Sequence, residues 1–363
     1  GAWANHAMNC ASFHLSASVR FMSHISSLTL TSFRSYPQLA LAGEPGFVIL
    51  TGANGAGKTN ILEAISLLSP GRGFRGAKLR DMDRAAPGGE FDLHAASSAS
   101  LPWVVAAEVY VKGEALQVGT GRDPESNIEK RITKINGQKV RGATALAEHM
   151  AVQWLTPSMD QVFVEGGTAR RKLLDRIVYG FLPEHAARVS AYELAMRERN
   201  RLLADRQMAD PYWLSVLEQQ MAEHAVAFTL ARLDVVQKLQ ITLEWKLSHF
   251  PRALLNLEGT LETWLMQGDS ALDVETKFAD RLLMMRGPDA ARGRANEGPH
   301  RSELKVIHRE KSAPAERCST GEQKALLLSI MLAAAKARAG WCGMPPILLL
   351  DEVIAHLDVD KRA

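Results

Sequence analysis

The first third of the chain alternates apolar and polar positions in short segments, separated by serine, proline and glycine breaks. This period of two predicts β-strands. The strands that we predict lie within residues 25–41 and at residues 47–50, 103–111, 115–118 and 128–135. Helical spacing of apolar side chains follows residue 60, at Ile61, Leu62, Ile65 and Leu68. Because Asn136-Gly137 is a strong hairpin signal, we expect an α/β region with an antiparallel section.

The pattern changes to helical spacing between residues 169 and 283. Three prolines divide this region into separate helices, Pro183, Pro211 and Pro251. No heptad of apolar positions continues across the prolines, so we predict a compact helical lobe and not a long coiled coil. A helix at 321–339 and an apolar strand at 347–350 follow. A strand this uniformly apolar is typical of a parallel sheet that is covered on both faces.

These changes of pattern predict four segments. Residues 1–21 lack the charged start and apolar block of a signal peptide, and we interpret them as a disordered extension. Residues 22–165 form the first part of an α/β lobe, and residues 166–287 form the helical lobe. Residues 288–363 return to the first lobe.

Composition narrows the class of protein without fixing it. The chain has 363 residues, with 46% hydrophobic and 23% charged residues, as expected for a soluble globular protein with two lobes. A net charge of +3 is too small to indicate nucleic acid by itself. The cysteines, at positions 10, 318 and 342, are too scattered for a disulfide framework or structural zinc, which favours the cytoplasm. No apolar run approaches the ~18 residues that span a bilayer, so no membrane is expected.

A glycine-rich segment between the strand at 47–50 and the following helix has the spacing of a phosphate-binding loop. Its residues are Gly52, Ala53, Asn54, Gly55, Ala56, Gly57, Lys58 and Thr59. Glycines let backbone N–H groups turn toward phosphates, and the helix start points its positive dipole end the same way. Lys58 would neutralise the β- and γ-phosphates, and the Thr59 hydroxyl would bind Mg²⁺. The segment predicts binding of a nucleoside triphosphate.

Two carboxylates follow the apolar strand at 347–350. An Asp at the carboxyl end of a buried strand is where a phosphate-loop enzyme holds Mg²⁺, which suits Asp351. A second carboxylate directly after it suits a general base that polarises water, which suits Glu352. The alternative interpretation of the pair is a helix cap after the strand.

A third segment, Ser319-Thr320-Gly321-Glu322, opens the predicted helix at 321–339. A serine and a glycine at a helix start supply a cap, backbone donors and a dipole for phosphate. Alone, the segment is equally typical of an ordinary helix start. It becomes specific because it precedes an apolar strand that ends in Asp-Glu by about thirty residues.

Together these segments resemble the ATP-binding-cassette superfamily, in which the signature Ser-Gly-Gly-Gln is usual. Within it the chain is similar to the RecF family of bacterial recombination mediators, from about residue 23 to the end. The supporting motifs are Phe33-Arg34-Ser35-Tyr36, Thr156-Pro157, Arg170-Arg171-Lys172-Leu173-Leu174-Asp175 and Gly298-Pro299-His300-Arg301. The resemblance implies an α/β P-loop ATPase lobe of the ATP-binding-cassette type, with a mixed sheet and an inserted compact α-helical lobe.

The resemblance also implies roles for individual residues. Lys58 and Thr59 would bind phosphate and Mg²⁺, and Asp351 would bind Mg²⁺. Glu352 would activate water. Residues 319–322 would bind the γ-phosphate of ATP held by a partner subunit.

Two further candidates are less specific. Gln153 stands where a metal- or water-sensing glutamine of this superfamily can lie. Arg34 is either a nucleotide contact or a surface arginine. We predict Gln153 as a metal ligand and Arg34 as a nucleotide contact.

The chain departs from the family pattern at two places. Thr320 and Glu322 replace smaller or neutral residues of the signature, which would weaken a contact with an anionic phosphate. The family's last strand and its switch histidine are expected beyond Ala363, so we expect the chain to be truncated at its C-terminus. His356 is too close to Asp351 to be that histidine.

Positive charge gathers locally although the total is modest. The clusters are Arg72, Arg75, Lys78, Arg80 and Arg84; Lys130, Arg131, Lys134, Lys139 and Arg141; Arg170, Arg171 and Lys172; and Arg197, Arg199, Arg201 and Arg206. Such clusters fit binding to a phosphate backbone, but solvated faces paired with acidic residues fit them as well. The DNA prediction therefore depends mainly on the resemblance.

The function implied is an ATP-dependent DNA-binding protein of recombinational repair and replication. ATP would drive homodimerisation, which clamps gapped or single-strand/double-strand junction DNA, and slow ATP hydrolysis would act as a timer. A RecR-like mediator is the partner implied, to help load the recombinase. The alternatives are an SMC-like or anti-phage ATPase of this type acting on DNA, and a transporter ATPase subunit.

Overall fold

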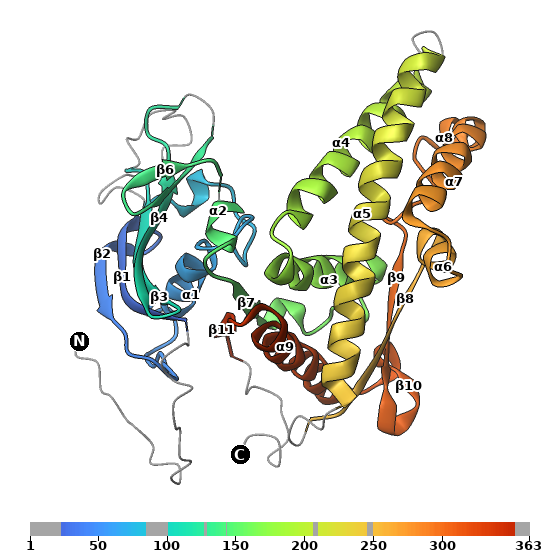
Figure 1. The fold of residues 1–363 in the computed structure, drawn as a ribbon. Helices are drawn as coiled ribbons and strands as arrows, with labels where there is room; N and C mark the ends of the chain where they lie inside the picture. The colour runs from blue at the N-terminus through green and yellow to red at the C-terminus, as the bar shows by residue number, and fades with distance from the viewer. Residues whose placement is uncertain are drawn as a thin grey trace.

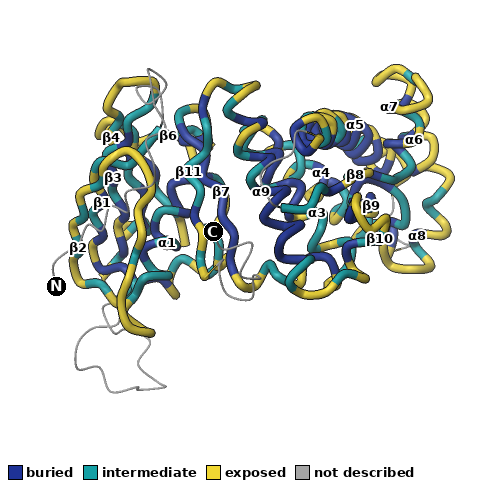
Figure 2. Tube along the Cα trace, turned by 90° about the horizontal axis from the view of Figure 1, so that it is seen from below, coloured by how far each residue is buried: buried dark blue, intermediate teal, exposed yellow. Residues whose placement is uncertain are grey.

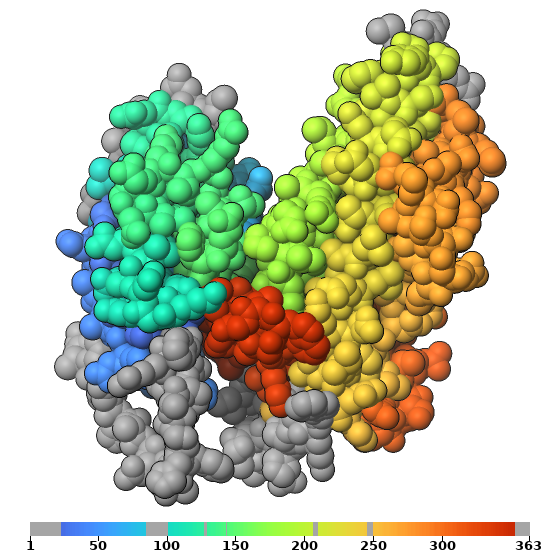
Figure 3. Space-filling model, viewed as in Figure 1, coloured from blue at the N-terminus to red at the C-terminus, as the bar shows by residue number. Residues whose placement is uncertain are grey.

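The computed structural model describes residues 23–84, 101–126, 129–142, 144–205, 210–244 and 250–352. A β-rich half and a helical half lie side by side, joined at the base by β7, β11 and α9 (Figure 1). On the face viewed in Figure 3, a hollow opens between the two halves above that base. The predicted extension at 1–21 lies outside the described residues.

The β-rich half is built on a six-stranded sheet in the order β2-β1-β3-β4-β5-β6. Its strands are β1 (His24–Phe33), β2 (Tyr36–Ala42), β3 (Val104–Val111), β4 (Glu114–Arg122), β5 (Arg131–Ile135) and β6 (Gln138–Val140). All neighbours are antiparallel, which confirms the antiparallel section. Asn136 and Gly137 have φ angles of 48° and 78°, the left-handed pair that a tight hairpin requires.

One predicted strand is not formed. Residues 47–50, directly before the phosphate loop, have no strand geometry, and the Phe47 and Ile49 side chains are 105% and 76% exposed. A strand requires a hydrogen-bonded neighbour, and among the described residues no strand pairs with this segment. The apolar run predicted the residue types of a buried strand but not its partner.

The two halves meet at a pair of parallel strands. β7 (Val152–Leu155) and β11 (Ile347–Leu350) pair in register, with Leu348 opposite Gln153. This confirms a parallel strand at 347–350. Its burial is smaller than predicted, because Leu349 is buried while Leu350 is 44% exposed.

The helical half contains a long antiparallel pair, α4 (His185–Ala204) and α5 (Pro211–Glu244) (Figure 1). The other helices of this half are α3 (Gly167–Phe181), α6 (Thr260–Met266), α7 (Ala271–Met284) and α8 (Arg286–Arg292). α3 ends two residues before Pro183 and α5 begins at Pro211, as predicted. Two strands that we did not predict, β8 (Ala253–Glu258) and β9 (Glu303–His308), pair along the side of these helices.

Short elements connect these larger ones. They are α1 (Lys58–Ser66), α2 (Thr144–Ala147), β10 (Ala313–Pro314), and 3-10 turns at Arg80–Met82, Pro157–Met159, Arg309–Lys311 and Ala315–Arg317. α9 (Thr320–Cys342) confirms the predicted helix at 321–339. Within the described residues, α9 is the helix long and apolar enough to cross a membrane, but 61% of its most apolar window is buried inside the protein. Its place between the halves is that of a core helix (Figure 2).

Buried apolar side chains of the described residues gather in three clusters. One lies between the six-stranded sheet and α1, and one lies in the outer part of α4, α5, α6 and α7. The third joins α3, α5, β8, β9 and α9. The predicted boundary at residue 288 stays a prediction, because α9 shares this cluster with helices of the second segment.

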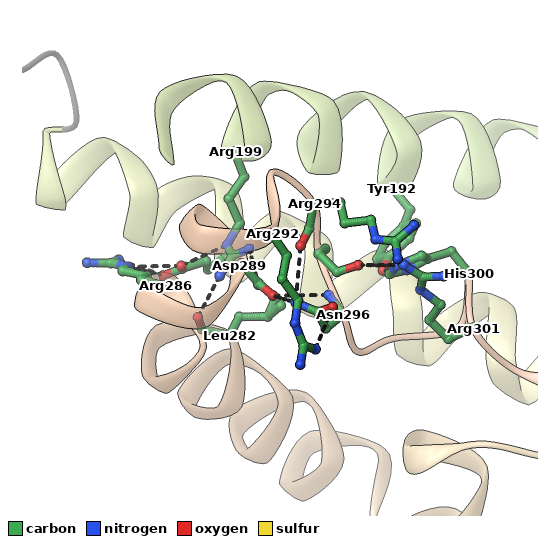
Figure 4. A network of polar contacts seen from close by, with 12 residues as sticks. Tyr192, Arg199, Leu282, Arg286, Asp289, Arg292, Arg294, Asn296, His300 and Arg301 are labelled. Carbon is green, nitrogen blue, oxygen red and sulfur yellow. Dashed lines mark hydrogen bonds and ion pairs between the residues drawn. The ribbon is translucent and has the colours of Figure 1, made fainter. Parts of the chain in front are cut away.

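A buried ionic network holds the outer helical half together (Figure 4). Arg199 of α4 is 0% exposed and donates to the carboxylates of Glu218 at 2.9 Å and Asp289 at 2.7 Å. It also donates to the Leu282 carbonyl at 2.6 Å. Arg286 provides a second cation for Glu218, at 2.6 Å. Two arginines thus face two carboxylates and join α4, α5, α7 and α8.

Candidate functional site

The phosphate loop turns directly into α1. Gly57 stands before the first helical residue with a φ of 93°, and Gly55 has a φ of 81°. Both values lie in the left-handed region that glycine adopts without steric cost. The Lys58 ammonium donates to the carbonyls of Gly52 at 2.6 Å and Ala53 at 2.8 Å. The lysine therefore bridges the two ends of the phosphate loop, and its positive charge lies at the loop.

Tyr36 fixes the back of this loop. Its hydroxyl donates to the Ala56 carbonyl at 3.1 Å. A Cβ atom at Gly57 would lie only 2.4 Å from the Tyr36 hydroxyl oxygen. Gly57 is therefore required twice, by its backbone angle and by the tyrosine packed against it.

A buried glutamate of α1 anchors the turn between β1 and β2. Glu63 is 1% exposed and accepts hydrogen bonds from Arg34 at 2.7 and 3.0 Å and from Arg75 at 2.9 Å. Arg34 also donates to the Asp81 carbonyl at 2.6 Å. Each of the three guanidinium nitrogens of Arg34 thus has a protein partner, and its nucleotide contact stays a prediction. Glu63 was missed, although an acid on the apolar face of a helix is a usable signal.

The two halves of the predicted nucleotide site meet at Thr59 and Asp351. The Thr59 hydroxyl donates to the Asp351 carboxylate at 3.4 Å across 292 positions of sequence. The Asp351 N–H donates to the Leu155 carbonyl at 2.9 Å, which extends the β7–β11 pairing by one residue. Burial and the neighbouring Glu352 charge raise the pKa of Asp351 above its usual value. The spacing predicted both residues, and the fold brings them together.

These oxygen donors suit Mg²⁺, which keeps few protein ligands and completes its shell with phosphate and water. Among the described residues, no cluster of three or more His, Cys, Asp or Glu side chains forms a metal site of its own. A Thr–Asp pair beside a phosphate loop is instead the donor set of a nucleotide-bound cation.

Glu352 follows on the exposed side of the same edge. It has a φ of 50°, a left-handed conformation that is uncommon for a residue other than glycine. Its carbonyl accepts from the Lys324 ammonium at 3.4 Å, and Lys324 also pairs with Asp160 at 3.3 Å. Lys324 lies in the second turn of α9, so this helix is connected to the end of β11. We predicted neither Lys324 nor Asp160.

The 319–322 segment begins α9 with a capping box. Ser319 caps the backbone of Glu322, and the Glu322 carboxylate accepts from the Ser319 N–H at 3.0 Å. Thr320 is the first helical residue, and Gly321 follows within the first turn. Among the described residues, no hydrogen bond or ion pair joins this segment to the phosphate loop. Its contact with a partner's phosphate stays a prediction.

Gln153 lies on the face of β7 opposite the phosphate-loop helix. Val152 and Trp154 point into the cluster with α1, whereas Leu155 points into the cluster with α3 and α9. The Gln153 amide lies beside Gly180 of α3, and among the described residues neither of its amide atoms has a hydrogen-bond partner. Its metal role stays a prediction that this geometry does not favour.

Many of the clustered arginines are paired with acids. The pairs are Arg197–Glu193, Arg201–Glu198, Arg170–Glu303, Arg80–Glu129 and the buried Arg199 network. Arg206 lies outside the described residues. By contrast, Lys134, Lys139 and Arg141 at the β5–β6 hairpin are exposed, and no ion pair joins them to another described residue. The hairpin therefore keeps available charge, and so do Arg72 and Lys78 in the cluster after α1, which are exposed and have no ion pair with another described residue.

Other motif residues join elements of the fold. Arg170 and Arg171 tie α3 to the start of β9, through Glu303 at 2.6 Å and the Ser302 carbonyl at 2.8 Å. Asp175, in the same motif, pairs with Arg232 at 2.7 Å and His185 at 3.0 Å. His300 shares a 2.7 Å hydrogen bond with the Tyr192 hydroxyl (Figure 4).

A phosphate loop, an Asp-Glu pair at the end of a parallel strand and a serine-capped helix before that strand define a P-loop ATPase fold of the ATP-binding-cassette type. A sequence model of the RecF/RecN/SMC N-terminal domain matches residues 24–363. The DNA replication and repair protein RecF of Allorhizobium ampelinum is 44% identical over 341 residues, which cover 93% of this chain and 87% of the relative. RecF of Mesorhizobium japonicum is 45% identical over 342 residues, or 94% and 86% of the two chains. The chain belongs to the RecF family.

Two solved structures share the fold. One is described as the recombination mediator protein RecF-ATPrS in the RecFOR pathway, with a TM-score of 0.81, 21% identity and coverage of 94% of this chain and 88% of the other. The second, RecF-ATP, has a TM-score of 0.79 at the same identity and coverage. They confirm the RecF-like fold of both halves.

Proposed function

We propose that this chain is an ATP-dependent DNA-binding protein of recombinational repair and replication. Each subunit would hold ATP in half of a site, and a second subunit would complete that site with residues 319–322. The observation that carries this proposal is the 3.4 Å hydrogen bond between Thr59 and Asp351. It brings the end of the phosphate loop next to the Asp351-Glu352 pair at the end of β11. The names of the similar structures, RecF-ATP and RecF-ATPrS, support ATP as the ligand.

The residues present fit ATP with Mg²⁺. The glycine-rich loop and the N-terminus of α1 offer backbone donors to phosphate, and the Lys58 ammonium can move from the loop carbonyls to the β- and γ-phosphates. Thr59 and Asp351 would hold Mg²⁺, which when bound neutralises developing charge on the phosphates. Glu352 would orient and deprotonate the attacking water.

The same geometry predicts slow turnover. Within the described subunit no hydrogen bond or ion pair joins residues 319–322 to the phosphate loop, so donors for the γ-phosphate would be complete only in a dimer. ATP binding would therefore favour the dimer, which clamps DNA, and hydrolysis would open it. The enzyme would be a weak, DNA-stimulated ATPase that serves as a switch.

The partners proposed follow from the family. Gapped or single-strand/double-strand junction DNA would be the nucleic acid, with the exposed hairpin cations Lys134, Lys139 and Arg141 as candidate phosphate contacts. The RecFOR pathway named for the similar structures supports a RecR-like mediator. A protein that acts on DNA in recombinational repair would work in the cytoplasm.

Binding to a gapped duplex as a function of salt tests this proposal. With ATP, the logarithm of the binding constant should fall steeply with the logarithm of salt concentration, because phosphate contacts release counterions. ADP and the Lys58→Ala variant should both lose the tight binding. Binding that ignores both nucleotide and salt would contradict the proposal. Blunt duplex of the same length is the control for structure preference.

A further inference from the structure

The first turn of α9 carries a negative charge where the proposed function needs to accept another. Glu322 occupies a position that is neutral in the usual signature, and its carboxylate lies at the helix start that would face a γ-phosphate. Two anions at this place would repel each other unless a cation offsets one of them.

The structure supplies that cation from a neighbouring turn. Lys311 ends the 3-10 turn Arg309–Lys311, and its ammonium contacts one oxygen of the Glu322 carboxylate. The other oxygen accepts from the Ser319 N–H at 3.0 Å. The side chain of Lys311 is 55% exposed and that of Glu322 is 20% exposed, so the pair lies at the surface. These two contacts, Lys311 first, lower the pKa of Glu322 to about 2.

We propose that Lys311 is a positioning residue that offsets the Glu322 charge and so lets the N-terminus of α9 accept the γ-phosphate of a partner subunit's ATP. This inference rests on the proposed dimer. Lys311 acts through Glu322: it holds the carboxylate against the helix start and leaves the cap locally neutral.

Four variants of the complete chain separate this role from a general loss of structure. Lys311→Gln removes the cation. Glu322→Gln removes the anion and keeps the capping box, because glutamine serves equally at this position. The third variant combines both changes. Lys305→Gln is the matched control, because Lys305 pairs with Glu258 at similar exposure on β9.

The measurement is the dimer dissociation constant with ATPγS and Mg²⁺, by sedimentation. Lys311→Gln should weaken the dimer by about fivefold at each of two sites, or about 25-fold in all. Lys305→Gln should stay within about twofold of the unaltered protein, and the double variant should stay within about threefold of Glu322→Gln alone. Binding of a fluorescent ATP analogue to the monomer should be unchanged throughout, because the phosphate loop is intact.

Three other results would contradict either the proposed function or the role of Lys311. An unaltered chain that stays monomeric with ATPγS contradicts the proposed function itself. A dimer that forms equally well with Lys311→Gln overturns only the role of Lys311. A double variant as weak as Lys311→Gln shows that the lysine acts independently of Glu322, which also overturns it.

Discussion

Arg199→Met tests whether the buried ionic network holds the helical half together. Methionine keeps much of the apolar volume of the arginine side chain and removes its charge. The arginine donates to Glu218, Asp289 and the Leu282 carbonyl, all three within 2.9 Å. After the change, Arg286 still faces Glu218, but among the described residues Asp289 keeps only the hydrogen bonds from Asn296.

The loss of stability that we expect for Arg199→Met follows from the unpaired charge of the Asp289 carboxylate. Asp289 is 1% exposed, and a carboxylate left unpaired at such a site destabilises a protein by about 3–5 kcal/mol. Because folded proteins are stable by only about 5–15 kcal/mol, the loss should be large. Adding Asp289→Asn removes the uncompensated charge, so the double variant should lose less than the sum of the single losses, with a coupling of about 2 kcal/mol.

Urea unfolding followed by circular dichroism, with hydrogen exchange in α4 and α7, measures both quantities. Arg201→Met is the matched control, because Arg201 lies two positions further on α4, is 74% exposed and pairs with Glu198. Arg201→Met should lower the free energy of unfolding by less than about 0.5 kcal/mol. A loss of less than about 1 kcal/mol for Arg199→Met, or additive single losses, would refute the reasoning.

Three other changes test the site and its support. Gly57→Ala should lower nucleotide affinity at least about tenfold in a fluorescence titration, because the left-handed backbone and the Tyr36 hydroxyl both oppose a Cβ atom. Adding Tyr36→Ala to this variant should restore only part of the lost affinity, because the backbone strain remains. Asp351→Asn should reduce the Mg²⁺ dependence of ATP binding in calorimetry, whereas a dependence equal to that of the unaltered protein would contradict Asp351 as a ligand. Burial, together with nearby Arg301, lowers the pKa of His300 to about 4. The unfolded chain therefore takes up a proton at a higher pH than the folded chain. As a result, the free energy of unfolding should fall as the pH drops from about 6.5 to about 4. His300→Asn should reduce that fall in urea titrations at both pH values, and an unchanged fall would contradict burial of a neutral ring.

Local sequence patterns predicted the elements whose partners are close in the chain. The hairpin at Asn136-Gly137 and helix α9 follow from spacing and turn chemistry alone. The strands β8 and β9 were missed because they pair across about fifty residues of mostly helical sequence, and only Ala253 and Leu257 of β8 are buried. Nothing local to 47–50 indicates whether a neighbouring strand lies alongside it.

The site divides in the same way. Glycine spacing and a strand that ends in Asp-Glu predicted Lys58, Thr59 and Asp351, because these motifs are contiguous. The side chains that support them, Glu63 and Lys324, depend on contacts between distant segments. Spacing cannot predict such contacts, because it does not say which helix faces which turn.

The central claim is that two subunits share each ATP site. The molar mass in solution of the Glu352→Gln variant with ATP and Mg²⁺ tests it most directly. This change keeps the shape of the side chain and removes the base proposed to activate water, so ATP should persist at the half-sites. In the complete chain, we expect a stable dimer with ATP and a monomer with ADP or without nucleotide, as measured by light scattering. A variant that binds ATP but remains monomeric would contradict the claim that two subunits share each site.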